Sequence, residues 1–388
     1  MRRNVSAAAR PLLVLLAVAL CAGCLGGGGG SSQTAAIGCP QKSRPATPLL
    51  IRLDQPPSGA EVCVGSVYLN VVMPAGWSGV PSLLAHATPG VHVWQERSLQ
   101  YGFTPCRGCP APALNPAQVE RDHPEWILKD VSGADVHPPG HPSWVMYDIS
   151  NVDYLDAWAN AAVSDLQGEK FVGVVLVDAG NHPAWVFPPV DPSTGKELTV
   201  SDHAVQQAEA MATVRAGLKT NGFSMVAENG PPTVIDPGQI GSTDAVSVGR
   251  GFARLSGVRW DGLFHYFEAA LDAKVGAWVW DGGRLDRTQR VFGLASYLLV
   301  SGLGASYAVA PDGDRDLYQL DPGLPTGDPV DDSGVWTRQF ESGAVAVNPG
   351  PVDGVVDLPG ANGVTVPAGG AVIDVGGTIT SSAGAARS

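Results

Sequence analysis

The stretch FVGVVLVDAGNHPAW (171–185) is the key to the fold. A run of aliphatic residues ends abruptly at Asp178, and a loop with glycine, histidine and tryptophan follows it. Continuous apolar runs of this kind are typical of parallel strands that helices cover on both faces. In barrels built from such strands, catalytic residues lie where the strand ends. Asp178 is therefore the first candidate catalytic residue.

Short apolar runs recur along the chain and alternate with helical patterns. Strands that alternate with helices predict a parallel sheet, and eight of them favour an α/β TIM (β/α)8 barrel over an open sheet. The candidate helices are DYLDAWANAAVSDLQ (153–167), SDHAVQQAEAMATVRAGLKTNG (201–222, with Ser201 as N-cap) and RTQRVFGLASYLLVSG (287–302). The candidate strands are SVYLNVVM (66–73), GVHVWQERS (90–98), SWVMYDIS (143–150), FVGVVLVD (171–178), FSMVAE (223–228), WDGLFHYFE (260–268), VGAWVWDG (275–282) and GASYAVA (304–310).

The two ends of the chain differ from this middle part. We expect the barrel domain over residues 41–335, with its last segment, 311–335, as a loop over one barrel face. Residues 336–380 contain short strands between glycine and proline turns and predict a small antiparallel β appendage. Residues 381–388 are expected to be a frayed tail.

The N-terminus has the pattern of an export signal. Three arginines precede the apolar run PLLVLLAVAL (11–20), which is too short for a permanent membrane helix. LCAGC (20–24) resembles a bacterial lipobox and predicts a signal peptide over 1–24 with lipidation at Cys24; an ordinary cleaved signal is the alternative. Residues 25–40 form a glycine-serine tether. We expect an extracytoplasmic protein that is lipid-anchored to the cell membrane, or else secreted.

Four further cysteines follow the signal. An oxidising compartment favours disulfides, and of the three possible pairings we prefer Cys39–Cys63 with Cys106–Cys109. The C-x-x-C spacing in TPCRGCPAP lacks the second pair that a zinc site needs.

Composition limits the class of partner. The chain of 388 residues is 44% hydrophobic, which suffices for a large core, and its net charge is −13. An acidic balance argues against nucleic acid, whose binding proteins carry basic patches. Ten tryptophans are many, and tryptophan faces are common platforms for sugar rings. We expect a monomer with a polysaccharide partner.

Carboxylates dominate the predicted strand ends. They are Asp148, Asp178, Glu228, Glu268 and Asp281, with His182 and Trp185 just after the fourth strand. A carboxylate-rich pocket without a nucleophilic Ser, Cys or Lys indicates glycoside hydrolysis, which needs two carboxyl groups in different environments.

We assign a role to each candidate. Asp178 is the nucleophile or charge stabiliser and Glu268, among aromatic residues, the general acid/base; Glu228 is the rival acid. Trp185 and Trp280 are expected to stack on sugar rings, and His182 to line the site. Asp148 and Asp281 border the substrate, although a structural role is the preferred interpretation for both.

A metal site or cofactor finds little support. HPPGHP places His137 and His141 close together, but the prolines between them exclude a helix that would bring both onto one face. No dinucleotide-binding or phosphate-binding glycine motif is present in the sequence. We expect no metal and no cofactor.

An ordered series of motifs resembles a known family. They are HPEWILKD (123–130), YDISNVDYLDAWA (147–159), FVGVVLVDAG (171–180), RWDGLFHYFE (259–268) and RQFESGAVAVNPG (338–350). Together they resemble the hypothetical glycosyl hydrolases of family fifteen, distant relatives of endo-alpha-1,4-polygalactosaminidases. The resemblance covers residues 60 to 380, with Val172 standing where the family usually has aspartate. It implies a TIM barrel with a β appendage and a catalytic pair matching Asp178 and Glu268.

Three functional hypotheses follow. The first is a glycoside hydrolase that cleaves an extracellular or cell-wall polysaccharide. The second is a non-catalytic glycan-binding lipoprotein on the same scaffold. The third is a structural envelope protein whose pocket is filled by its own loop, residues 311–335.

Overall fold

The computed structural model describes residues 47–53, 64–65, 68–74, 79–103, 111–138, 140–179, 188–229, 237–302, 304–309 and 316–382. The chain divides into Met1–Gly38 and Cys39–Ser388, and every element below belongs to the second unit. The predicted signal peptide, the tether, Cys24, both predicted disulfides, His182 and Trp185 lie outside the described residues.

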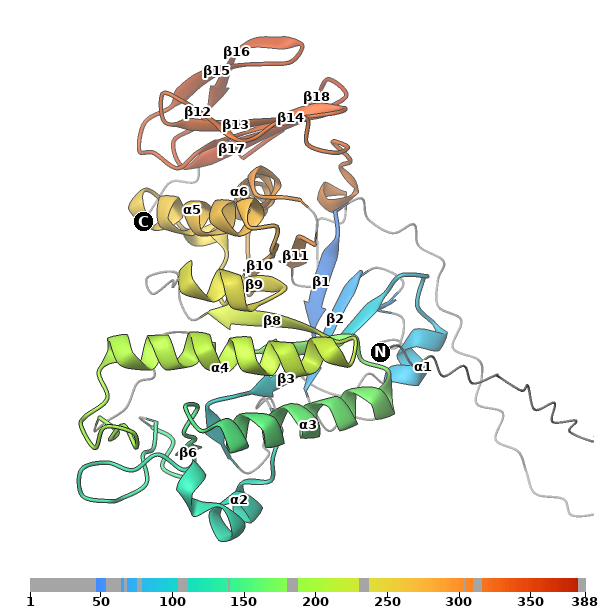
Figure 1. Cartoon of the computed structure of the whole chain (residues 1–388). Helices are drawn as coiled ribbons and strands as arrows, with labels where there is room; N and C mark the ends of the chain where they lie inside the picture. Colours follow the sequence, from blue (N-terminus) through green and yellow to red (C-terminus); the bar gives the residue numbers. More distant parts are fainter. Residues whose placement is uncertain are drawn as a thin grey trace, which may run out of the picture. The chain divides into compact units, whose positions relative to one another are not determined.

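Eight parallel strands close into a barrel, which confirms the predicted fold class (Figure 1). The ring closes because β1 pairs with both β2 and β11, and β2 pairs with β3. β5 (Ala111–Pro112) adds to β3 outside the ring. The barrel strands are β1 (Leu49–Arg52), β2 (Asn70–Pro74), β3 (His92–Ser98), β7 (Gly173–Leu176), β8 (Ser224–Asn229), β9 (Ala245–Val248), β10 (Gly276–Asp281) and β11 (Ser306–Val309).

Helices connect most neighbouring strands and cover the outside of the ring. The capping chemistry explains where they begin: the Asn151 side chain accepts from the first-turn amides of α3, and Asp286 forms a capping box with Gln289 at α6. α4 begins at Val200 with Thr199 as its N-cap, so the prediction of Ser201 as N-cap was wrong. The helices are α1 (Val80–Ala85), α2 (Pro116–Asp122), α3 (Val152–Glu169), α4 (Val200–Thr220), α5 (Val258–Asp272) and α6 (Arg287–Leu299).

Several single-turn helices and short strands complete the connections. β4 (Tyr101–Gly102), η2 (Pro124–Trp126) and β6 (Val145–Met146) lie between β3 and α3, and η3 (Pro237–Ser242), η4 (Phe252–Arg254) and η5 (Leu317–Gln319) follow β8, β9 and β11. Within the described ranges, no helix is both long enough and apolar enough to cross a bilayer.

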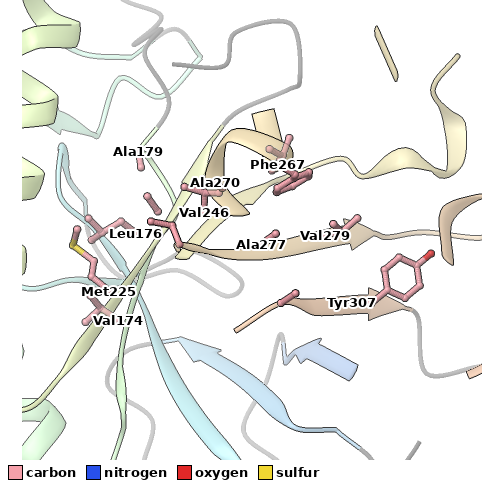
Figure 2. Close-up of a cluster of buried hydrophobic side chains, with 14 of the residues drawn as sticks. Val174, Leu176, Ala179, Met225, Val246, Phe267, Ala270, Ala277, Val279 and Tyr307 are labelled. Carbon is pink, nitrogen blue, oxygen red and sulfur yellow. The ribbon is translucent and has the colours of Figure 1, made fainter. Parts of the chain in front are cut away.

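Side chains alternate between two cores because successive residues of a strand point to opposite faces. Figure 2 shows part of the outer core, in which Val174 of β7 lies near Met225 of β8, and Val246 of β9 lies near Ala270 of α5. The inner core fills the barrel itself. Its members include Leu50, Val72, Trp94, Val175, Val226 and Trp278.

Two of the eight predicted strands were wrong. WDGLFHYFE (260–268) belongs to α5, because its buried residues Trp260, Leu263, Phe264 and Phe267 follow the helical period of 3.6 rather than the strand period of 2. In SWVMYDIS (143–150), only β6 is a strand, and it pairs antiparallel with β4 outside the ring. The missing barrel members are β1 and β9, whose four-residue runs LLIR and AVSV are too short to stand out.

The C-terminal region is the predicted antiparallel appendage. A five-stranded sheet, in the order β12-β13-β14-β17-β18, faces the hairpin β15–β16, and a small core of valine, leucine and alanine lies between them. On the barrel side, β14 and β17 contact α6. The strands are β12 (Val330–Asp332), β13 (Val335–Phe340), β14 (Gly343–Asn348), β15 (Gly354–Leu358), β16 (Ala361–Val366), β17 (Gly370–Val375) and β18 (Thr378–Ser381).

Arg338 ties this appendage to the barrel. Its Nη1 donates to the carbonyl oxygens of Leu299 and Ser301, each at 2.7 Å, at the C-terminal end of α6. Its Nε donates to the carbonyl of Gly327 at 3.0 Å. The last carbonyls of a helix have no partner within the helix, so the guanidinium satisfies groups that would otherwise be buried unpaired.

We predict that Arg338→Met lowers the free energy of unfolding by about 2–3 kcal/mol, because buried carbonyls lose their donor while the aliphatic packing is kept. Urea unfolding monitored by tryptophan fluorescence measures this. Arg121→Met, at an exposed arginine that pairs with its neighbour Asp122, is the control and should change stability by less than about 0.5 kcal/mol. Equal losses in the two variants would contradict the role of Arg338.

Candidate active site

The last inward-facing layer of the barrel carries charge. Leu50, Trp94, Val226 and Trp278 face inward, so the residues two positions further along the same strands face inward as well. Because the strands are parallel, these next residues all lie at the C-terminal mouth, where TIM barrels place their chemistry. They are Arg52, Glu96, Glu228 and Trp280.

One guanidinium joins the two glutamates across the mouth. Arg52 Nε lies 3.0 Å from Glu96 Oε2, and Arg52 Nη2 donates to Glu228 Oε2. The guanidinium carbon lies 4.6 Å from the centroid of the Trp280 ring. The glutamate side chains are only 8% and 11% exposed. A single planar cation forms ion pairs with both glutamates, so the two carboxylate oxygens that it contacts lie no more than about 8 Å apart.

Two polar groups beside this pair have no hydrogen-bond partner among the described residues. Ser247 lies opposite Glu228 in the β8–β9 register, and its hydroxyl is fully buried. The indole N–H of Trp280 is likewise buried without an acceptor in the described part of the chain. Buried polar groups are normally satisfied. This mouth therefore offers hydrogen-bonding capacity to a polar molecule that enters it.

Asp178 lies just beyond β7, at the barrel end that the sequence predicted, but other groups hold its carboxylate. It accepts from Ser98 Oγ at 2.5 Å and from the backbone amides of Leu99 and Gln100 at 3.0 and 2.8 Å. Burial raises the pKa of Asp178, while these three hydrogen bonds act to lower it. The carboxylate thus binds the segment after β3 to the end of β7.

Glu268 does not lie at the mouth, and its predicted position at a strand end was wrong. It occupies the C-terminal half of α5, which leads into the start of β10. A helix that leads back to the start of the next parallel strand ends at the N-terminal side of the barrel, so Glu268 lies toward the side opposite Asp178. Its Oε2 lies 3.0 Å from His265 Nδ1 on the helix surface. The predicted pair of Asp178 and Glu268 does not share one site.

The other two strand-end aspartates hold backbone structure, as the preferred interpretation expected. Asp148 accepts from the amide and hydroxyl of Ser150 at 3.0 and 2.6 Å, in the turn that leads into α3. Asp281 accepts from the Ala253 amide and the Tyr307 hydroxyl, each at 2.8 Å. Burial raises the pKa of Asp281 to about 6.

The histidines of HPPGHP are engaged by their own loop. His137 Nδ1 lies 2.5 Å from the carbonyl oxygen of Trp144, and the His141 ring stacks on Trp144. Over the residues that the structure describes, no group of three or more His, Cys, Asp and Glu side chains is arranged to hold a metal ion.

Residues 321–325 of the loop predicted over a barrel face lie at the N-terminal side, whereas Asp316 pairs with Arg287 at the start of α6 and β12 belongs to the appendage. Pro322, Leu324 and Pro325 line a cavity of about 980 Å³ together with Asn70 and Ser306, the first residues of β2 and β11. Residues 321–325 therefore lie away from Arg52 and the glutamate pair.

Sequence reasoning found Glu228 but missed Arg52, Glu96 and Ser247. Glu96 was detectable, since it follows Trp94 by two residues in the predicted strand 90–98 and shares its face. Glu96 is not the final residue of that strand, whereas the predicted candidates all lie at or just after a strand end. Arg52 and Ser247 belong to β1 and β9, the two strands that the sequence did not reveal.

Comparisons with known proteins show distant similarity only. No family model and no curated protein matches the chain. Among solved structures, it is similar to the glycoside hydrolase domain of PelA from Pseudomonas aeruginosa (12% identity, TM-score 0.44, covering 68% of this chain and 95% of that one). It is also similar to a noncanonic maltogenic alpha-amylase, AmyB, from Thermotoga neapolitana (11%, 0.48, 86% and 92%). A third is the GH36 alpha-galactosidase AgaA from Geobacillus stearothermophilus (13%, 0.45, 79% and 47%).

These neighbours are glycoside hydrolases, but the similarity is too low for their activities or residues to be transferred. The assignment of a closed barrel rests on the strand pairings of this chain alone.

The buried Asp281 gives a pH prediction. Its folded-state pKa of about 6 exceeds the ordinary value of 3.8, so the folded state binds this proton more tightly than the unfolded state. The contribution to stability is fully present below about pH 4 and is lost as pH rises through about 6. Asp281→Asn removes this loss, so its stability relative to the unmodified protein should rise by about 2–3 kcal/mol between pH 4 and 7.

Urea unfolding at four pH values across this range tests the prediction. Asp357→Asn, at an exposed carboxylate that also accepts from a backbone amide, is the matched control and should run parallel to the unmodified protein. Parallel curves for Asp281→Asn would show that burial does not shift this group as stated.

Proposed function

We propose that this chain is a glycoside hydrolase in which Glu96 and Glu228 are the two acting carboxyl groups. One observation carries the proposal: two buried glutamates face each other across a single guanidinium at the C-terminal mouth of a closed barrel. Glycosidases need two carboxyl groups about 5–5.5 Å apart for retention or about 6.5–9.5 Å for inversion. The upper bound of about 8 Å set by the bridging cation falls within this span.

The surroundings support the same chemistry. One carboxyl donates a proton to the oxygen of the leaving sugar, and the other attacks the anomeric carbon or activates water. We assign the acid role to Glu228 and the second role to Glu96. The Trp280 ring offers an apolar face to a sugar, and the Ser247 hydroxyl and Trp280 N–H offer hydrogen bonds to sugar hydroxyls.

The proposed substrate and location are supported by sequence features. The export signal and Cys24 support an extracytoplasmic, lipid-anchored monomer that acts on an extracellular or cell-wall polysaccharide. The resemblance to polygalactosaminidase relatives places amino-sugar polymers first among the substrates to test. Asp178 is assigned to the rim, where it positions the segment after β3.

A non-catalytic glycan-binding lipoprotein is the second candidate, and one observation favours it. Arg52 pairs with both glutamates at once. Cleavage needs the two carboxyl groups to act on the sugar linkage, and here both are engaged by one arginine. A barrel with this arrangement can retain glycan without cleaving it.

We predict that Glu228→Gln and Glu96→Gln each lower hydrolysis by at least about 10²-fold, because each removes one acting carboxyl group while keeping its shape. Released reducing ends are measured over a panel of bacterial polysaccharides that includes amino-sugar polymers. Glu268→Gln, on the surface of α5, is the control and should keep full activity. Unchanged turnover in either mouth variant would remove the pair from the mechanism.

The same panel separates the two candidate functions. If the unmodified protein binds a polysaccharide in affinity electrophoresis but releases no ends, the binding module is supported. In either case Trp280→Ala should weaken retention about 10-fold or more, since the stacking surface is lost. Retention unchanged by this substitution would place the glycan elsewhere on the protein.

A further inference from the structure

The N-terminal end of the barrel is hollow. The middle inward-facing layer is bulky, since it contains Trp94, Trp278 and several branched aliphatic side chains. The residues two positions earlier on the same strands also face inward, because side chains alternate along a strand. At this end of the barrel they are small or polar: Asn70, His92, Ser224, Gly276 and Ser306. TIM barrels normally fill their interior with layers of bulky branched residues, so this layer leaves space that such residues would occupy.

This space is a cavity of about 980 Å³. Volumes of roughly 300–1,000 Å³ are typical of sites for small molecules. Its outer wall is the segment 321–325, which is bonded to the end of β13 and the turn that follows it. The amide of Glu341 donates to the carbonyl of Leu324 at 3.0 Å. The amide of Ser342 donates to the carbonyl of Pro322 at 2.8 Å, so the backbone of this wall is held in place.

Aromatic and aliphatic side chains supply most of the inner surface of the cavity. The rings of Trp94 and Trp278 meet edge to face at its inner end, with their centroids 5.0 Å apart. Tyr297 and Leu298 of α6 and Phe340 of β13 line its sides. Flat apolar walls of this kind favour a ring system, whose burial removes apolar surface from water.

A short chain of hydrogen bonds supplies the polar part of the cavity. Trp94 Nε1 donates to Asn70 Oδ1 at 2.8 Å, and Asn70 Nδ2 donates to Ser306 Oγ at 2.7 Å. These bonds use one N–H and one lone pair of the Asn70 amide, which has two of each. Because Asn70 lines the cavity, a polar group that enters can bond to its second N–H or lone pair.

The charges around the cavity favour a neutral ligand. The Asn70 amide and the Ser306 hydroxyl are uncharged, and Asp244 at the cavity edge already pairs with Arg215 at 2.7 Å. An ion that entered would lose hydration that an amide and a hydroxyl do not replace. An uncharged molecule loses far less.

We propose that this cavity binds a small uncharged amphipathic compound, a ring system that carries a hydroxyl or amide group. The rings pack against the aromatic walls, and the polar group bonds to the Asn70 amide. A free sugar fits less well, because each of its hydroxyls needs a partner and most of the walls are apolar. The cavity lies at the barrel end opposite Arg52 and the glutamate pair, so this site goes beyond the proposed function and does not depend on it.

The first test fills the cavity. Binding of N-phenyl-1-naphthylamine, an uncharged fluorescent ring compound, is titrated against the purified protein. Ser224 faces inward at the start of β8 and lines the cavity, so Ser224→Leu places extra volume in it. We expect this variant to weaken binding by at least about 10-fold, because the rings lose their space. Unchanged binding in a folded Ser224→Leu variant would show that the compound binds elsewhere and would overturn the proposal.

Two further variants complete this test. Ser82→Leu makes the same substitution at an exposed serine of α1, away from the described walls of the cavity, and should leave binding unchanged. An equal loss in Ser82→Leu would assign the effect to the added leucine and not to the cavity, which also overturns the proposal.

Leu324→Ala shortens a wall residue that is 70% exposed, so this variant keeps the fold. It should weaken binding about 3-fold, because the rings lose apolar contact. If Ser224→Leu does not fold, unchanged binding in Leu324→Ala overturns the proposal.

The second test assigns the polar contact. 2-Naphthol and naphthalene share a ring system and differ in one hydroxyl, and both are used to displace the fluorescent compound. Asn70→Leu keeps the size of the side chain but removes its polar atoms, so the ratio of the affinities for 2-naphthol and naphthalene should fall about 3–10-fold. An unchanged ratio contradicts the bond to Asn70. Stronger displacement by N-acetylglucosamine than by 2-naphthol overturns the proposed class of ligand.

Discussion

The structure depends on the closure of the barrel by β1, a strand of four residues. Its hydrogen bonds join β11 on one side and β2 on the other, and without them the parallel sheet would stay open along two edges. The same strand ends in Arg52, which reaches across the mouth to β3 and β8. The backbone of β1 closes the ring of strands, and the Arg52 side chain links β1 to β3 and β8 inside the barrel mouth.

The sequence predicted the barrel and its appendage but not all of the barrel strands. A short aliphatic run such as the one that ends at Asp178 is typical of a strand covered on both faces, and the structure confirms this strand as β7. The α5 segment was predicted as a strand because aromatic residues favour strands. Its buried residues, at positions 260, 263, 264 and 267, instead have the spacing of a helix. Half of the mouth followed from the sequence: Glu228 did, but Arg52 could not, since its strand carries too few residues to show a period.

The acids at the strand ends divide into two groups according to the face of the strand. Asp178 and Asp281 lie two residues after Leu176 and Val279 of the outer core, so they face outward. They accept hydrogen bonds from loop amides and fix the loops around the mouth. Glu96 and Glu228 lie two residues after Trp94 and Val226 of the inner core, so their side chains point into the barrel. Reading every second residue, rather than the last residue of each run, separates carboxylates that hold loops from those that face a ligand.

The ring closure has a consequence for how the chain folds. Leu49 pairs with Tyr307, so the contact that seals the barrel joins its first and last strands, which lie far apart in the sequence. Contacts between such distant segments form late, because the entropy of a long loop is lost before they reward it. Until then the inner wall, with its buried tryptophans and charged mouth, faces water. A partly synthesised chain of this protein is therefore an open sheet with edges that other chains can pair with. Its solubility depends on how fast the first and last strands of the barrel pair.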